Sequence, residues 1–174
     1  MIEIIPQYTL CFLLCEDQVL MLLRNSPPNQ GLWNGVGGHI EAGETPNNSC
    51  IREVSEETGY KLETASFHGL LTWEGFEIPS GGLFLFSATT SEKIIITCDE
   101  GTLAWQSQKW ACSAPEVVSN LHIVLPFIFQ QTFPQVYHFS YQDNSILSYQ
   151  ISPIPASIFI MVHGRDNQES IDPI

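Results

Sequence analysis

The sequence predicts an α+β fold with a mixed β-sheet, formed by one domain over residues 1–155. Short apolar runs lie on both sides of one well-capped helix, a pattern typical of this fold class. Hydrophobic residues make up 44% of the 174 residues, enough for one compact core. Residues 156–174 are predicted to be a C-terminal extension, whose role the sequence does not define.

Apolar runs bounded by turn residues predict the strands. They occur at 8–14, 19–23, 32–36, 62–73, 82–89, 94–98, 102–106, 136–141 and 146–151. The first two flank Glu16 and Asp17, which indicates a β-hairpin. Loops are expected at 24–31, where Pro27 and Pro28 bar regular structure, and at 39–44.

A helix is predicted to begin at Pro46. Thr45 is a suitable N-cap, proline suits the first helical position, and Gly59 suits the position after the last turn. The spacing of the apolar residues predicts one buried stripe, made of Cys50, Ile51 and Val54. A second, short helix is expected from Pro126 to about residue 131.

The charge balance limits the classes of partner. Six Lys and Arg stand against nineteen Asp and Glu, which gives a formal net charge of −13. DNA, RNA and anionic membranes require clustered basic residues, so nucleic-acid polymers and membranes are not expected as partners. A phosphate ligand would need metal ions to supply the positive charge.

No targeting or membrane segment is expected. Glu3 stands where a signal peptide has basic residues, and Glu16 with Asp17 interrupts the first apolar stretch. Residues 117–142 have no charged side chain, but Pro126 and Pro134 disfavour a membrane-spanning helix there. The five cysteines form no CxxC pair, so a cytoplasmic protein with reduced thiols is expected. The sequence does not predict the oligomeric state.

Three glutamates share one face of the predicted helix. Glu53, Glu56 and Glu57 are spaced i, i+3 and i+4. A solvated acidic face is one explanation. Two features weigh against that explanation. These carboxylates lie near the helix C-terminus, where the macrodipole disfavours negative charge, and a glycine-rich turn that can bring backbone groups close to a ligand precedes the helix. Carboxylate oxygens are ligands that Mg²⁺ prefers.

The segment containing these glutamates resembles the Nudix box, G-x5-E-x7-R-E-U-x-E-E-x-G-U, where U is a bulky apolar residue. The matching residues are Gly38, Glu44, Arg52, Glu53, Val54, Glu56, Glu57 and Gly59. Tyr60 fills the last position less typically. Seven fixed residues match by chance less often than about once in 10⁷ starting positions.

The resemblance implies a Nudix α/β/α sandwich in which the box forms a loop–helix–loop. It implies that Mg²⁺, or Mn²⁺, is bound by Glu53, Glu56 and Glu57 with the backbone carbonyl of Gly37. Gly38, Glu44, Arg52 and Gly59 would support the geometry. The catalytic base would be Glu56, Glu57 or a glutamate from a distant loop, for which Glu100 is the candidate. An ordinary turn acid is the alternative for Glu100, and an exposed, salt-bridging arginine is the alternative for Arg52.

The run GLWNGVGGHIEAGET is similar to the MutT-type 8-oxo-dGTP diphosphatases within this family. That similarity implies that Asn34 and Asn120 contact the base, that Trp73 stacks on it and that Arg24 approaches the phosphates. Packing in the core is the alternative for Trp73. The chain has Asn120-Leu121 where the animal enzymes have two aspartates, and His39 where Lys or Arg is common.

The expected function is therefore Mg²⁺-dependent hydrolysis of a nucleoside triphosphate, such as the oxidised purine 8-oxo-dGTP, to the monophosphate and pyrophosphate. This would be a nucleotide-pool sanitising reaction on a small-molecule substrate. Undamaged dNTPs, dinucleoside polyphosphates and nucleotide sugars are alternative substrates. A nucleotide sensor without hydrolytic activity is the alternative from another class.

Overall fold

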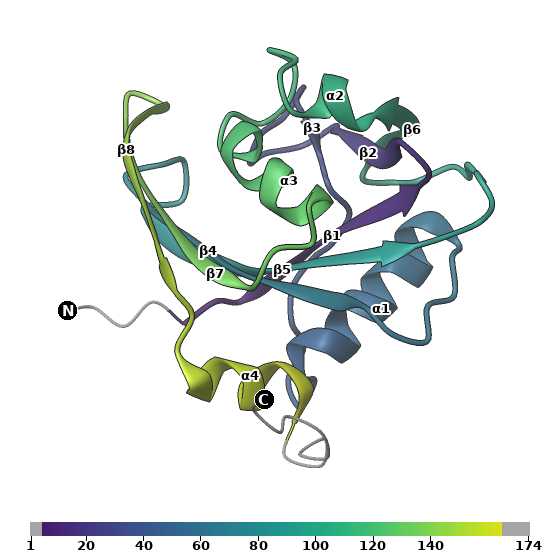
Figure 1. The fold of residues 1–174 in the computed structure, drawn as a ribbon. Coiled ribbons are helices and arrows are strands. Elements are labelled where there is room, and N and C mark those ends of the chain that lie inside the picture. Colours follow the sequence, from purple (N-terminus) through teal and green to yellow (C-terminus); the bar gives the residue numbers. More distant parts are fainter. Residues whose placement is uncertain (1–4, 165–174) are drawn as a thin grey trace.

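The computed structural model describes residues 5–164, which form eight strands and four helices (Figure 1). The strands are β1 (Tyr8–Cys15), β2 (Gln18–Arg24), β3 (Trp33–Asn34), β4 (Ser66–Glu74), β5 (Ser80–Thr89), β6 (Gly101–Ser107), β7 (Gln135–Gln142) and β8 (Ser145–Pro153). The helices are α1 (Pro46–Thr58), α2 (Gln108–Ala111), α3 (Leu121–Phe129) and α4 (Ala156–His163). None of the helices between residues 5 and 164 is long and apolar enough to span a bilayer.

The strands form a mixed sheet in the order β3-β2-β1-β5-β4-β7-β8, with β6 also paired to β2. β1 runs parallel to β5 and β4 runs parallel to β7, whereas the other pairs of named strands are antiparallel. β1 and β2 pair only next to their hairpin, at Leu14 with Val19 and at Cys15 with Gln18. The two strands then part, because residues 33–39 lie between them: Trp33 and Asn34 pair with β2, and Val36 pairs with Cys11 of β1.

Helices cover both faces of the sheet. α1 and α4 lie on one face, and α2 and α3 lie on the other (Figure 1). Side chains alternate along β1 accordingly, since Phe12 packs in the core beneath α3 and Leu13 packs in the core beneath α1. The α/β/α sandwich and the mixed sheet predicted from the sequence are confirmed.

α1 has the predicted boundaries. The Thr45 hydroxyl accepts a hydrogen bond from the Asn48 amide at 3.2 Å, and Pro46 occupies the first turn. Gly59 ends the helix with a φ of 75°, in the left-handed region that favours glycine. Cys50 and Val54 are buried as predicted, and Ile51 is half-buried.

Three predictions of secondary structure were wrong. Residues 94–98 form a loop rather than a strand. The helix expected to begin at Pro126 begins at Leu121, so Pro126 lies inside it. Burial of Leu121, Val124, Leu125 and Ile128 offsets the hydrogen bond that this proline cannot donate. Of the strand expected at 32–36, only Trp33–Asn34 is regular.

The structure also places part of the predicted extension. Residues 156–163 form α4, and Val162 is buried in the core beneath α1. Phe159 of α4 makes an edge contact with Phe67 of β4, with the ring centroids 5.9 Å apart. The boundary at residue 155 stays a prediction, and residues 165–174 lie outside the described residues.

Candidate active site

A cavity of about 590 Å³ opens where β1 and β2 part. Its wall brings together residues that are far apart in the sequence. Of the predicted site residues, it is lined by Arg24, Asn34, Gly37, Gly38, Glu53, Glu57, Trp73, Glu100 and Asn120. Glu44, Arg52, Glu56 and Gly59 do not line it. Glu53 and Glu100 lie close enough to Glu57 for their charges to act on it, whereas Asn120 and Tyr141 are hydrogen-bonded to each other. A further carboxylate, Glu77, also lines the cavity.

Two glycines bring the backbone of the turn before α1 close to its neighbours. A Cβ atom on Gly37 would lie 2.1 Å from the Thr9 carbonyl oxygen. A Cβ atom on Gly38 would lie 2.5 Å from Oε1 of Glu53. Only glycine avoids these overlaps, so the turn can pass directly against β1 and against the carboxylates of α1.

Glu57 is the most buried carboxylate of the site. Glu57 is only 8% exposed, and its Oε2 accepts a hydrogen bond from the Gly37 amide at 3.0 Å. Burial raises the pKa of Glu57 to about 7, and the negative charges of Glu53 and Glu100 act in the same direction. The Gly37 amide and the Arg24 guanidinium lower it in part. Burial likewise raises the pKa of Glu53. Unfavourable negative charge thus accumulates at this end of the cavity.

The donor set fits a hard divalent cation. Glu53, Glu57 and Glu100 offer carboxylate oxygens to the same cavity, and a cation there would offset the charge that raises the pKa of Glu57. Between residues 5 and 164, no three Asp, Glu, His or Cys side chains lie close enough to hold a metal by themselves. Glu56, predicted as a third ligand, points to Arg52 instead. The arrangement suits Mg²⁺, which takes its remaining ligands from water and substrate phosphates.

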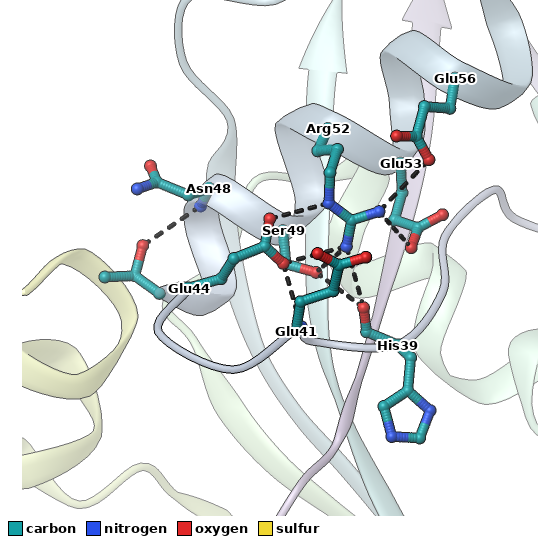
Figure 2. A network of polar contacts seen from close by, with 9 residues as sticks. His39, Glu41, Glu44, Asn48, Ser49, Arg52, Glu53 and Glu56 are labelled. Carbon is teal, nitrogen blue, oxygen red and sulfur yellow. Dashed lines mark hydrogen bonds and ion pairs between the residues drawn. The ribbon is translucent and has the colours of Figure 1, made fainter.

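Arg52 is surrounded by oxygen atoms that accept hydrogen bonds from its guanidinium group (Figure 2). Its Nε and Nη2 donate to the two carboxylate oxygens of Glu44, at 2.7 and 2.9 Å. Its Nη1 donates to Glu53 at 2.9 Å and to Glu56 at 3.3 Å, and Nη2 also donates to the His39 carbonyl at 3.0 Å. These hydrogen bonds from Arg52 lower the pKa of Glu44 to about 2. The geometry joins the loop before α1 to the carboxylates of the helix.

Aromatic and amide groups form another part of the wall. Asn120 donates from Nδ2 to the Tyr141 hydroxyl at 2.9 Å. Trp73 is 9% exposed and donates from its indole nitrogen to the Ile78 carbonyl, so it belongs to the core as well as to the cavity wall. Asn34 accepts from the Gly35 amide at 2.8 Å. Arg24 donates from Nε to the Pro28 carbonyl at 2.7 Å, which holds its side chain at the cavity.

Sequence reasoning missed three aromatic residues of the wall. Tyr8, Phe76 and Tyr141 line the cavity, and the ring centroids of Phe76 and Tyr141 are 4.9 Å apart. Tyr141 lies in a strand that was predicted, but the alternation of side chains along a strand does not show which face meets a cavity. Phe76 lies in the turn between β4 and β5, for which the sequence carried no signal.

Hydrogen bonds fix both ends of the loop that carries Glu100. At one end, the Tyr60 hydroxyl donates to the Glu92 carbonyl and accepts from the Ile94 amide, both at 2.6 Å. At the other end, Asn25 donates from Nδ2 to the Asp99 carbonyl at 2.7 Å and from its backbone amide to the Glu100 carbonyl at 3.1 Å. Tyr60, the less typical residue of the box, thus connects the end of α1 to this loop.

Replacing Tyr60 with Phe is expected to lower the free energy of unfolding by about 1–3 kcal/mol, because two hydrogen bonds are lost and the Ile94 amide is left without its partner. Urea unfolding measures this difference. Tyr149→Phe is the matched control, since Tyr149 is exposed, and its change should stay below about 0.5 kcal/mol. Equal stabilities of the two variants would contradict the role given to the Tyr60 hydroxyl.

Comparison with known proteins identifies the family of this chain. The family model of the NUDIX domain matches residues 6–122. The Nudix hydrolase YvcI of Bacillus subtilis is 30% identical over 155 residues, which cover 86% of this chain and 96% of that protein. The oxidized purine nucleoside triphosphate hydrolase of Mus musculus is 34% identical over 67 residues, which cover 38% of this chain and 43% of that enzyme.

A solved structure agrees as well. The MutT protein from Bacillus halodurans superposes with a TM-score of 0.72 at 28% identity, covering 87% of this chain and all of that one. The family model spans more than half of the chain, and the relative YvcI aligns over nearly its whole length. The chain therefore belongs to the Nudix hydrolase family.

Proposed function

We propose that the chain hydrolyses a nucleoside triphosphate to the monophosphate and pyrophosphate with Mg²⁺, or Mn²⁺, and that an oxidised purine such as 8-oxo-dGTP is the substrate. One observation carries the proposal. A single cavity is lined by Glu53, Glu57 and Glu100, whose carboxylate charges interact, and by Asn120 and Tyr141, which are hydrogen-bonded to each other beside the Phe76 ring. This division suits a ligand with a polyphosphate at one end and a base at the other.

The roles of the residues follow from their positions. Mg²⁺ held by Glu53 and Glu57 would supply positive charge to the phosphates. Glu57 is the first candidate to accept a proton from the attacking water, because its carboxylate lines the cavity beside that of Glu53. Glu100 is the second candidate for this base. Glu56 is a weaker one, since its side chain bonds to Arg52 outside the cavity.

The base-binding part of the proposal rests on Asn34 and Asn120. Because Asn120 donates to Tyr141 through Nδ2, its Oδ1 remains available as an acceptor. Trp73 and Phe76 offer apolar surface beside it. One relative supports the substrate class by name, since it is an oxidized purine nucleoside triphosphate hydrolase.

Product release from a substrate panel tests the proposal. The panel contains 8-oxo-dGTP, dGTP, ADP-ribose and diadenosine polyphosphates, each assayed with Mg²⁺, with EDTA and after Mg²⁺ is restored. We expect metal-dependent pyrophosphate release and a kcat/KM for 8-oxo-dGTP at least about tenfold above that for dGTP. Preference for ADP-ribose or a dinucleotide would overturn the substrate. Tight nucleotide binding without any product under Mg²⁺ or Mn²⁺ would indicate a sensor instead.

A further inference from the structure

The cavity is lined by a fourth carboxylate, which the metal site does not use. Glu77 lies in the turn between β4 and β5, residues 75–79, and is exposed. None of the ion pairs among residues 5–164 includes Glu77. Because the proposed substrate is a polyanion, a carboxylate on the cavity wall opposes binding unless it contacts hydrogen-bond donors of the substrate. The position of Glu77 along the cavity therefore decides what it can do.

The turn that carries Glu77 packs against the Asn120 part of the wall. The ring of Phe76, the preceding residue, lies 4.9 Å from that of Tyr141, whose hydroxyl accepts a hydrogen bond from Asn120. The turn lies beside the β7–β8 hairpin, and the C-terminal end of α1 lies on the opposite side of the molecule (Figure 1). Glu77 is therefore near the groups proposed to bind the base and away from the carboxylates of α1.

The side chain of Asn120 is directed to the cavity at a cost to α3. Asn120 directly precedes this helix, where an asparagine usually caps the first turn, but its side chain makes no capping hydrogen bond. It donates through Nδ2 to the Tyr141 hydroxyl instead, and it lines the cavity. Its Oδ1 is left as an acceptor. Asn120 and Glu77 thus both offer acceptors at the same end of the cavity.

We propose that Glu77 determines base specificity by accepting hydrogen bonds from a purine edge with two adjacent N–H donors, as guanine has at N1 and the 2-amino group. This inference rests on the proposed function, because it needs the base at this end of the cavity. A carboxylate can accept two parallel N–H bonds, whereas adenine presents one donor next to its unprotonated N1. Oxidation at C8 leaves the two guanine donors unchanged, so this contact selects guanine and not its oxidation state.

The ratio of kcat/KM for dGTP to kcat/KM for dITP tests the contact, since the base of dITP lacks only the 2-amino group. We expect a ratio of at least about five in the unmodified chain, falling to within about twofold of one in Glu77→Gln and in Glu77→Ala. Partial unfolding of a variant cannot produce this result, because the ratio does not depend on how much enzyme is folded. A ratio that neither variant changes overturns the proposal.

Glu74→Gln is the matched control. Glu74 lies three residues away in the same hairpin and is exposed, but it does not line the cavity. The substitution removes the same charge, so the ratio should stay within about twofold of that of the unmodified chain. A fall as large as in Glu77→Gln would mean that the ratio responds to charge near the hairpin, and it would overturn the contact with Glu77.

Binding of the monophosphates dGMP and dIMP in EDTA, measured by calorimetry, separates this inference from the proposed hydrolysis. We expect dGMP to bind at least about fivefold more tightly than dIMP, with the difference lost in Glu77→Gln. That result without hydrolysis of any triphosphate would support the contact and overturn the proposed function. Metal-dependent hydrolysis with equal affinities for dGMP and dIMP would overturn the contact and leave the proposed function standing.

Discussion

Replacing Glu57 with Gln is expected to lower the turnover of the nucleotide substrate by on the order of 10²-fold or more. Glutamine keeps the size of the side chain and an acceptor for the Gly37 amide, but it removes the negative charge offered to a cation and the group suited to accept a proton. Steady-state kinetics with saturating Mg²⁺ measures the effect. Glu63→Gln is the control, because Glu63 is exposed and does not line the cavity, and it should retain full turnover.

The raised pKa of Glu57 predicts the stability of this variant, so a stability measurement can show whether a loss of turnover comes from misfolding. Because the folded-state pKa is raised from 4.5 to about 7, the folded protein binds this proton more tightly than the unfolded chain. The ionised carboxylate therefore opposes folding above pH 7, and that penalty disappears as the pH falls through 7 toward 4.5. Glu57→Gln removes the penalty, so in EDTA at pH 8 the variant should unfold at a urea concentration no lower than the unmodified chain. Near-normal turnover by such a folded variant would contradict the role of Glu57.

Replacing Arg52 with Ala is expected to lower the free energy of unfolding by about 2–3 kcal/mol and to lower turnover with it. The substitution leaves Glu44, Glu53 and Glu56 without the cation that holds them, while Arg52 itself does not line the cavity. Arg52→Lys retains the charge but loses the two-pronged contact with Glu44, so an intermediate stability is expected. Urea unfolding and steady-state kinetics of both variants measure these effects.

The pH dependence of the stability lost in Arg52→Ala shows whether Arg52 stabilises the fold through its contact with Glu44. Arg52 lowers the pKa of Glu44 from 4.5 to about 2, so this contact stabilises the fold above pH 4.5 and loses its contribution as the pH falls from 4.5 toward 2. The difference in stability between the unmodified chain and Arg52→Ala should therefore narrow below pH 4.5. A difference that is constant from pH 7 to pH 3 would show that Arg52 acts through packing of its alkyl chain rather than through Glu44.

Local signals predicted the helix of the site well but misassigned the nearby segment 94–98, which was predicted to be a strand. Thr45, Pro46 and Gly59 act within one or two turns of α1, and the structure has the helix ends that they predict. Residues 94–98 look like a strand because three isoleucines follow one another, yet they form a loop in which the Ile94 amide donates to the Tyr60 hydroxyl. That contact joins residues 34 positions apart in the chain, so no local pattern indicates it.

The spacing of the three glutamates is a further case. Glu53, Glu56 and Glu57 share one helix face, and the sequence analysis predicted the same role, a metal ligand, for all three. In the structure Glu57 is buried against Gly37, Glu53 lies between Arg52 and the cavity, and Glu56 is turned to Arg52. The three glutamates have different surroundings because the turn at 37–38 and the loop at 39–44 cross the helix at particular points. The spacing of residues along the helix does not indicate where those crossings lie.

The sequence by itself determined the family, the position of α1 and the acidic cluster, because these depend on residue identity and on spacing within a single helix. Only the tertiary structure decided which carboxylates share a cavity, that Glu100 joins Glu53 and Glu57, that Tyr141 and Phe76 complete the wall, and that β8 is the outermost strand. Those features depend on the pairing of strands distant in the chain and on the burial that follows, and both arise only when the whole sheet forms.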